Sequence, residues 1–188
     1  MKNILFIILF FPIRLIAQET IDFKDYVKFK SEMEFVLKGF SEDSLNVHFK
    51  KYINEYRISK GKNKIQYDPK LNVVTKDQTD YCAKNGFLTH DQIDNPNKLT
   101  FIDRANFYNY ENELYGENLC SFGGYLYFYN TRKFTNNFYD ILAKNAFESW
   151  KNSKGHNSVL LMDNMGNFSV NMSVKNENFY FCYLVGLN

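Results

Sequence analysis

The sequence predicts an α+β fold, in which helices are layered against an antiparallel sheet. Two observations predict this class. Most of the chain carries apolar residues at the spacing of helices, whereas the last part changes to the two-residue alternation of a strand, followed by a continuous apolar run. Because the helices come first and the paired strands come later, the two kinds of element are expected to form separate layers.

The first helix is expected from about Leu45 to Lys60. Ser44 is its predicted N-cap, and Gly61 supplies a left-handed stop. Its apolar stripe consists of Leu45, Phe49, Tyr52, Ile53 and Tyr56. His48, within this helix, is interpreted as an ordinary helix residue.

The second helix begins at Asp68-Pro69, a cap followed by proline in the first helical position, and ends at Gly86. The segment Phe87-Leu88-Thr89-His90-Asp91 follows at once. A histidine is therefore presented where the chain leaves a rigid element, which is where functional side chains are often carried. After a turn at Asn95-Pro96, a short helix is expected in which Thr100 and Asp103 form a variant of the capping box.

A third long helix is expected from about Asn137 to Ser153, with Trp150 in its buried stripe. Lys154-Gly155 is predicted to stop it, and His156 follows directly, so the arrangement around the first histidine is repeated. The aromatic stretch Gly123–Tyr129 fits either a strand or a packed loop.

The last part of the chain predicts a β-hairpin. Residues 167–174 alternate between polar and apolar, as in a strand with one wet face, and Asn176–Asn178 supplies the turn. The continuous apolar run Phe179–Val185 is expected to be a buried strand.

The first residues predict export. Residues 1–17 have a positive start and an apolar run too short to cross a bilayer, which is typical of a signal peptide cut after Ala17. Residues 18–43 form a lead-in without a clear period, and residues 44–188 form one domain. The alternative is an uncleaved N-terminal anchor, which Arg14 favours. With cleavage, the protein would be secreted or held in the periplasm or cell envelope.

The charge of the chain excludes one class of partner, and its cysteines limit the possible disulfide bridges. Removal of residues 1–17 takes away Lys2 and Arg14, so the 23 basic side chains fall to 21, against 21 acidic ones. A neutral domain lacks the basic surface that nucleic-acid binding requires, so nucleic acid is not an expected partner. The three cysteines, Cys82, Cys120 and Cys182, permit three different single bridges. Cys82 faces the interior and is expected to be an inert thiol.

Five segments share the order of a known family pattern. They are Asn54-Glu55-Tyr56-Arg57, Asp68-Pro69-Lys70-Leu71, Leu88-Thr89-His90, Gly116-Glu117-Asn118 and Trp150-Lys151-Asn152-Ser153-Lys154-Gly155-His156. From about Leu45 to Gly186 the chain resembles bacterial members of the CAP superfamily, also called SCP-like domains (cysteine-rich secretory proteins, antigen 5, pathogenesis-related proteins). It departs from their pattern at Asn157, where relatives usually carry arginine, and at Phe181-Cys182-Tyr183, which replaces tryptophan-threonine-glutamine.

The resemblance implies a three-layer α-β-α sandwich with a small antiparallel sheet, and a cleft that contains two histidines and acidic residues. Residue by residue, His90, Glu117 and His156 match positions of that cleft. A second acid is not identified, because Glu148 precedes the tryptophan of its helix, and Ser153 stands where plant and animal members carry glutamate.

The chemistry of these side chains allows three roles. Two imidazoles and a carboxylate are suitable ligands for a divalent metal such as Zn²⁺, with a coordination position left open. Alternatively, Glu117 hydrogen-bonds His90 directly, orients the ring and raises its basicity. The third possibility is a structural role, in which the bonded histidine organises its loop.

Two classes of function follow. The first is an exported binding module for a metal ion, a small apolar ligand or an extracellular protein. The second is a hydrolase in which His90, Glu117 and His156 activate water, directly or through a metal. Binding is preferred, because no residue has the setting of an activated nucleophile and the second acid is missing. A family resemblance also implies a shared scaffold more securely than a shared reaction.

Overall fold

The computed structural model describes residues 23–123 and 138–187 of the 188-residue chain. The predicted signal peptide, most of the aromatic stretch Gly123–Tyr129 and the predicted start of the third helix lie outside the described residues. The elements are α1 (Phe23–Lys38), α2 (Glu42–Ser59), β1 (Gln66–Tyr67), a 3₁₀ turn (Pro69–Leu71), α3 (Asn72–Asn85), a second 3₁₀ turn (Pro96–Lys98), α4 (Phe101–Phe107), β2 (Leu114–Phe122), α6 (Phe138–Lys151), α7 (Lys154–Leu160), β3 (Asn167–Lys175) and β4 (Asn178–Gly186).

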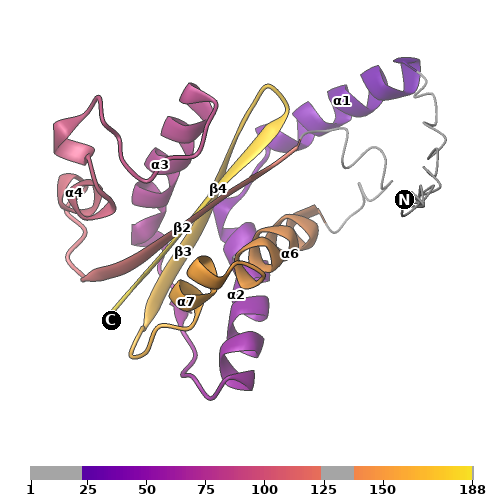
Figure 1. Ribbon diagram of the computed structural model, residues 1–188. Helices are drawn as coiled ribbons and strands as arrows, with labels where there is room; N and C mark the ends of the chain where they lie inside the picture. The colour runs from indigo at the N-terminus through magenta and orange to yellow at the C-terminus, as the bar shows by residue number, and fades with distance from the viewer. Residues whose placement is uncertain (1–22, 124–137, 188) are drawn as a thin grey trace, which may run out of the picture.

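The described elements form three layers (Figure 1). The sheet has the strand order β1-β3-β4-β2, and helices α2, α6 and α7 lie on one face while α3 and α4 lie on the other. Strands β2, β3 and β4 pair antiparallel, whereas the two-residue strand β1 pairs parallel with β3. The predicted α+β class and α-β-α sandwich are confirmed. Among the described helices, none is both long and apolar enough to cross a membrane.

The predicted lead-in contains a helix, α1. Its Met33 side chain is fully buried, and Lys30 binds Glu177 of the β3–β4 turn at 2.7 Å between Nζ and Oε1. The next helix, α2, starts three residues before the predicted position. Its N-cap is Ser41, whose backbone is extended and whose side chain accepts a hydrogen bond from the amide of Ser44. Ser44 therefore lies in the first turn and is not the cap.

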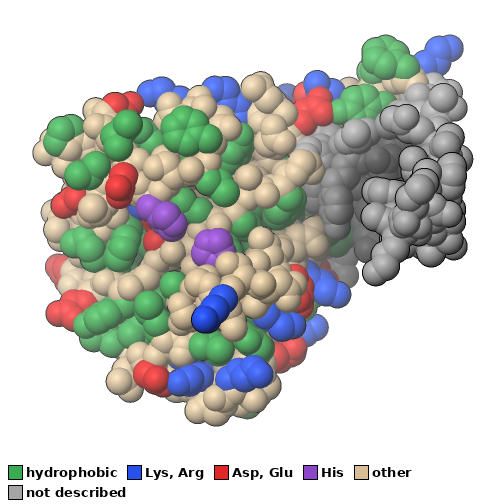
Figure 2. Space-filling view, in the orientation of Figure 1, with side chains coloured by type: hydrophobic (Ala, Val, Ile, Leu, Met, Phe, Trp, Pro, Cys, Tyr) green, Lys and Arg blue, Asp and Glu red, His purple; other side chains and the backbone are tan. Residues whose placement is uncertain are grey.

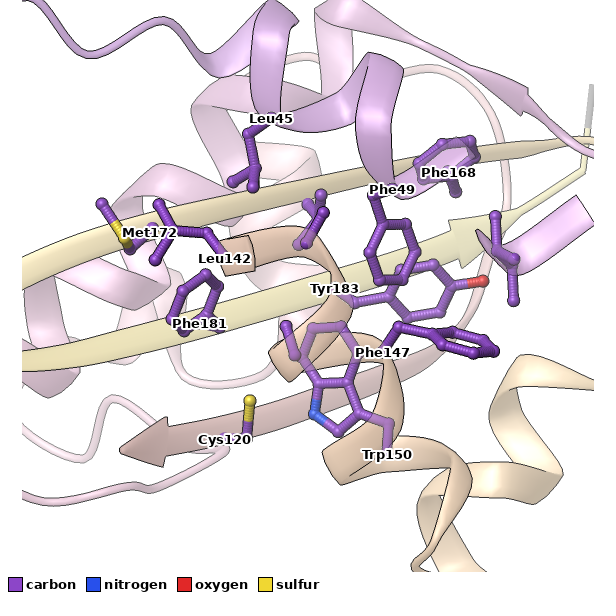
Figure 3. Packing of buried hydrophobic residues seen from close by; sticks show 14 of the residues in the cluster. Leu45, Phe49, Cys120, Leu142, Phe147, Trp150, Phe168, Met172, Phe181 and Tyr183 are labelled. Carbon is purple, nitrogen blue, oxygen red and sulfur yellow. The ribbon is translucent and has the colours of Figure 1, made fainter. Parts of the chain in front are cut away.

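The face covered by α2 and α6 is apolar and rich in aromatic rings. The rings of Phe49, Trp150, Phe168 and Tyr183 gather between α2, α6 and the sheet (Figure 3), and the centroid of Phe49 lies 5.6–5.7 Å from those of the other three. Edge-on and tilted contacts at this distance add stability beyond the burial of apolar area. The predicted role of Trp150 as a core residue is confirmed, since its side chain is fully buried.

The opposite face of β3 was expected to be wet, and this prediction is wrong. Ser169 and Asn171 are almost completely buried, because α3 packs over them. Their polar groups are satisfied within the interface. Ser169 donates a hydrogen bond to Asn72 Oδ1 at 2.7 Å, and its oxygen lies 3.2 Å from the hydroxyl of Thr75. The alternation thus marks a polar seam between the sheet and α3.

The predicted hairpin and the left-handed stop at Gly86 are confirmed. The predicted stop of the third long helix at Lys154-Gly155 is wrong, because α6 already ends at Lys151 and these two residues begin α7. Asn176 and Glu177 both have positive φ angles, 49° and 64°, as a two-residue hairpin turn requires. Strand β4 is buried over nearly its whole length. Gly86 ends α3 in the left-handed conformation with φ of 80°, and its amide bonds the carbonyl of Cys82. The stop of α3 therefore fixes where the segment carrying His90 begins.

Candidate functional site

The three predicted site residues come from different layers. His90 lies in the loop after α3, Glu117 lies in β2, and His156 lies in α7. The Gly116-Glu117-Asn118 segment of the family pattern lies within β2. His156 was expected directly after a helix stop but lies inside α7, because Ser153 takes the extended conformation of an N-cap and a new helix begins at Lys154.

Glycine at position 116 allows α7 to approach this strand. A Cβ atom on Gly116 would lie 2.6 Å from Cγ1 of Val159, which is closer than real Cβ contacts. The side chain of Met162 lies next to the same point. The helix that carries His156 can therefore pack on β2 only where the strand has no side chain.

His90 and Glu117 form a hydrogen-bonded pair. The distance between His90 Nδ1 and Glu117 Oε1 is 2.9 Å. The side chain of Glu117 is 1% exposed, whereas that of His90 is 56% exposed, so the ring has one nitrogen on the buried carboxylate and the other on its open side. The hydrogen bond that the His90 ring donates to Glu117 raises the pKa of His90 above its ordinary value. One of the predicted arrangements, direct bonding between these two residues, is present.

Arg104 binds the same carboxylate, and no pattern in the sequence predicted this contact. Its side chain is fully buried, and Nη2 donates to Glu117 Oε2. Nη1 donates to the backbone carbonyl of His90 at 3.1 Å and to that of Leu99 at 3.4 Å. The only signal in the sequence is indirect: Arg104 follows the capping box of α4, which fixes where this arginine stands on the helix.

The loop that carries His90 is held at several further points. Gln78 of α3 donates to the carbonyl of Thr89 and, through Oε1, accepts from Gln92 at 3.1 Å. Lys98 Nζ donates to Asp77 Oδ1 at 2.8 Å, and Gln92 donates to Asp77 Oδ2 at the same distance. Residues 86–99 are thus fixed to α3 from both ends by buried or half-buried side chains.

His156 has a different environment. Its backbone carbonyl accepts a hydrogen bond of 2.9 Å from Nδ2 of Asn118, which ties α7 to β2. Burial lowers the pKa of the His156 ring, and the nearby charge of His90 lowers it further. On the face shown in Figure 2, histidine side chains lie close to one another, with acidic and apolar side chains beside them. The effect of the His90 charge on the His156 ring means that the two imidazoles lie near one another although their layers differ.

The carboxylate of Glu117 is fully engaged. One oxygen is bound by His90 and the other by Arg104. Within residues 23–123 and 138–187, no group of three or more His, Cys, Asp and Glu side chains is arranged to hold a metal ion. Candidate metal-binding atoms at this surface include the second ring nitrogen of His90 and the ring nitrogens of His156, with Glu117 as the group that orients the His90 ring.

Comparison with known proteins identifies the family. The family model described as "CAP: Cysteine-rich secretory protein family" matches residues 50–186, which is well over half of the chain. The chain belongs to this family. The CAP domain begins within α2, so α1 lies outside the matched region. A comparison with curated protein sequences gave no match.

Solved structures agree with this CAP fold. An outer surface protein from Borrelia burgdorferi is similar with a TM-score of 0.55 and 15% identity over 79% of this chain and 96% of that protein. An extracellular protein containing an SCP domain from Bacillus anthracis is similar with a TM-score of 0.54 and 18% identity over 76% of this chain and 41% of that protein. At these identities the likeness concerns the fold alone.

The Asn54–Arg57 motif of this CAP domain has a structural role. The Asn54 side chain exchanges two hydrogen bonds, of 2.8 and 2.9 Å, with the backbone of Ile65. Arg57 is fully buried and donates to three carbonyls, those of Asn63, Leu160 and Met162, at 2.8–3.0 Å. Arg57 therefore holds the C-terminal end of α7, the helix of His156.

Other candidates of the sequence analysis lie away from this cluster. Glu148, considered as a second acid, pairs with Lys151 one turn later on α6 at 3.2 Å. His48 lies on α2 with Nδ1 3.3 Å from Asp140 Oδ1. These contacts are ordinary surface pairs between or within helices.

All three cysteines of the CAP domain are buried and free, so none of the three possible bridges is formed. Cys182 Sγ lies 3.6 Å from Glu117 Oε2, and Cys82 Sγ lies 3.6 Å from the carbonyl of Thr89. Burial raises the pKa of both thiols. The departure from the family pattern at Cys182 thus places a protonated thiol against the carboxylate of the site.

Proposed function

We propose that this protein is an exported CAP-domain binding module and that His90 and His156 form a weak site for a divalent metal such as Zn²⁺. In this proposal Glu117 is not a ligand but orients His90 from behind. A bound metal would supply a Lewis-acid position at which a small ligand could coordinate in place of water.

The observation that carries this proposal is the pairing of His90 Nδ1 with a buried carboxylate. Histidines that bind metals usually donate their other ring N–H to a carboxylate or carbonyl, which fixes the tautomer and increases the basicity of the ligating nitrogen. Here Glu117 occupies that place, and the second nitrogen of His90 lies on the exposed side of the ring. The burial of His156, which favours its neutral form, also suits a ligand.

Apolar side chains around His90 favour a ligand that is not entirely polar. Phe87, Leu88 and Ile93 belong to the same loop and are 55%, 40% and 79% exposed. A small molecule that contacted these side chains while bound at the histidines would bury apolar area.

Hydrolysis receives less support from the same geometry. A general base must have a lone pair free to take a proton from water. Both oxygens of Glu117 already accept hydrogen bonds, one of them from the permanently charged Arg104. A His/Glu-dependent hydrolase would therefore have to use a histidine as its general base, with Glu117 only orienting the ring.

Zinc titration calorimetry on the purified domain tests the binding proposal. We expect one measurable Zn²⁺ site, and we expect binding to disappear in the double variant His90→Ala, His156→Ala. His48→Ala is the matched control, since this histidine lies on α2 away from the cluster, and its removal should leave the affinity unchanged. Unaltered zinc affinity in the double variant would reject the metal site.

Export is proposed on two grounds: the N-terminal pattern of residues 1–17, and the fact that the structural neighbours named above are an outer surface protein and an extracellular protein. N-terminal sequencing of protein recovered from the medium or the cell envelope should give Gln18 as the first residue. Recovery of the chain with Met1 at its N-terminus, fixed to membranes, would favour the uncleaved anchor.

A further inference from the structure

We propose that Arg104 is the positioning residue of this site: it holds the carboxylate of Glu117 and the backbone of His90 at the same time, and so fixes the ring of His90. The expected effect of Arg104 on metal binding rests on the proposed function. The positioning itself follows from contacts within the protein.

Arg104 reaches His90 by two routes. Through Nη2 it binds Glu117 Oε2, and the other oxygen of that carboxylate binds the ring of His90. Through Nη1 it binds the backbone carbonyl of His90 itself. The side chain and the main chain of one residue are therefore held by a single guanidinium.

The ion pair of Arg104 and Glu117 is buried, whereas the histidine that it supports is exposed. The side chains of Arg104 and Glu117 are 0% and 1% exposed, whereas that of His90 is 56% exposed. Water cannot replace the contacts of the two buried groups, and a buried carboxylate without its arginine would be left with an uncompensated charge. The exposed imidazole is thus supported by an ion pair that solvent does not reach.

The shape of the guanidinium suits this role. Three acceptors have to be bound together, namely Glu117 Oε2 and the carbonyls of His90 and Leu99. A planar fork with fixed donor directions can do this, whereas the ammonium group of lysine is a single point with three rotatable donors. Arg104→Lys should therefore keep a positive charge near Glu117 but lose hydrogen bonds to the carbonyls of His90 and Leu99.

The test uses the metal-free full domain and measures the tautomer of His90 by nitrogen NMR at one fixed pH. In the wild type we expect a single state with a proton on Nδ1, bonded to Glu117. In Arg104→Met this single state should be lost, and Arg104→Lys should restore it in part. Zinc affinity, measured separately, should fall by about 10- to 100-fold in Arg104→Met, the range seen for groups behind a metal ligand.

Arg57→Lys is the matched control. Arg57 is also fully buried, but it donates to carbonyls of the loop after α2 and of α7 and does not touch His90 or Glu117. It should lower the melting temperature and leave the His90 tautomer as in the wild type. If Arg104 only stabilised the fold, variants of Arg104 and Arg57 with the same loss of melting temperature would have the same His90 tautomer.

The outcomes separate this inference from the proposed function. A wild-type His90 tautomer in folded Arg104→Met would overturn the positioning role, whatever the zinc affinity. Absence of zinc binding in the wild type would reject the metal proposal, while the tautomer comparison would still decide on Arg104. If Arg104→Met does not fold, Arg104→Lys decides: a tautomer population identical to that of the wild type would count against the inference.

Discussion

The two faces of the sheet stabilise the fold in different ways. The face under α2 and α6 is an aromatic core, in which Phe49 contacts Trp150, Phe168 and Tyr183. The face under α3 includes a buried polar seam at Ser169, and it continues into the hydrogen-bonded loop of His90. Burial of apolar area is not directional, whereas hydrogen bonds fix direction. We infer that the apolar face supplies most of the stability and that the polar face supplies the geometry of His90 and Glu117, whereas His156 lies on α7 over the other face.

The largest expected effect is on the apolar face. Trp150→Ala removes the largest fully buried side chain and should lower the free energy of unfolding by about 3–5 kcal/mol. Urea denaturation measures this loss. It is followed by circular dichroism and not by tryptophan fluorescence, because Trp150 is the only tryptophan of the chain. Trp150→Phe should lower the free energy of unfolding by clearly less, because phenylalanine fills part of the same space. A loss below about 1 kcal/mol for the alanine variant would contradict the assigned role of this face.

The second effect concerns the carboxylate of the site. Glu117→Gln replaces a buried charge that accepts from Arg104 and His90, and hydrogen bonds to charged groups contribute about 1.5–3 kcal/mol each. We expect a loss of that size in the free energy of unfolding, measured in urea with a chelator present. Glu55→Gln, on the exposed surface of α2, is the matched control and should change little.

This loss should depend on pH in a defined direction. Glu117 raises the pKa of His90 above the ordinary 6.5, so protonation of the ring favours the folded state. The contribution is fully present below the ordinary pKa and is lost as the pH rises through the raised value. The destabilisation by Glu117→Gln should therefore be larger at about pH 5.5 than at about pH 9. The reverse order would mean that His90 does not gain from the carboxylate.

The third effect is smaller and tests the polar seam. Ser169→Ala removes a buried hydroxyl that donates to Asn72 and lies within hydrogen-bond distance of Thr75, and it should cost about 1 kcal/mol. The same denaturation measurement applies. Ser121→Ala, at an exposed position of β2, should be neutral. An equal free energy of unfolding in the two variants would mean that the hydrogen bonds of Ser169 do not stabilise the protein.

The same contrast explains what the sequence could predict. The capping box of Thr100 and Asp103 and the left-handed stop at Gly86 are confirmed, because each depends on residues within four positions of one another. The bond between Arg104 and Glu117 joins α4 to β2, and no local pattern indicates it. The face of Ser169 was predicted to be wet, because alternation is the same whether water or a helix with small polar side chains covers the strand.

The cysteines provide a probe for each face, and the expected effect on the native protein is the smallest of all. Cys120 lies in the aromatic core, and Cys82 and Cys182 lie in the cluster under α3. Burial raises the pKa of Cys120 to about 12 and also raises the pKa of the other two thiols. Since the thiolate is the reactive form, a thiol reagent should label none of them in the native state and all three after denaturation.

Labelling at low urea concentrations, with the modified residue identified by mass spectrometry, compares the two faces directly. Regions held by fewer apolar contacts open locally at lower free energy. Cys82, which is bonded to the carbonyl of Thr89 in the site loop, should therefore react before Cys120. Earlier labelling of Cys120 would show that the aromatic face opens first. The aromatic face would then not be the more stable of the two, and the contrast between the faces would be wrong.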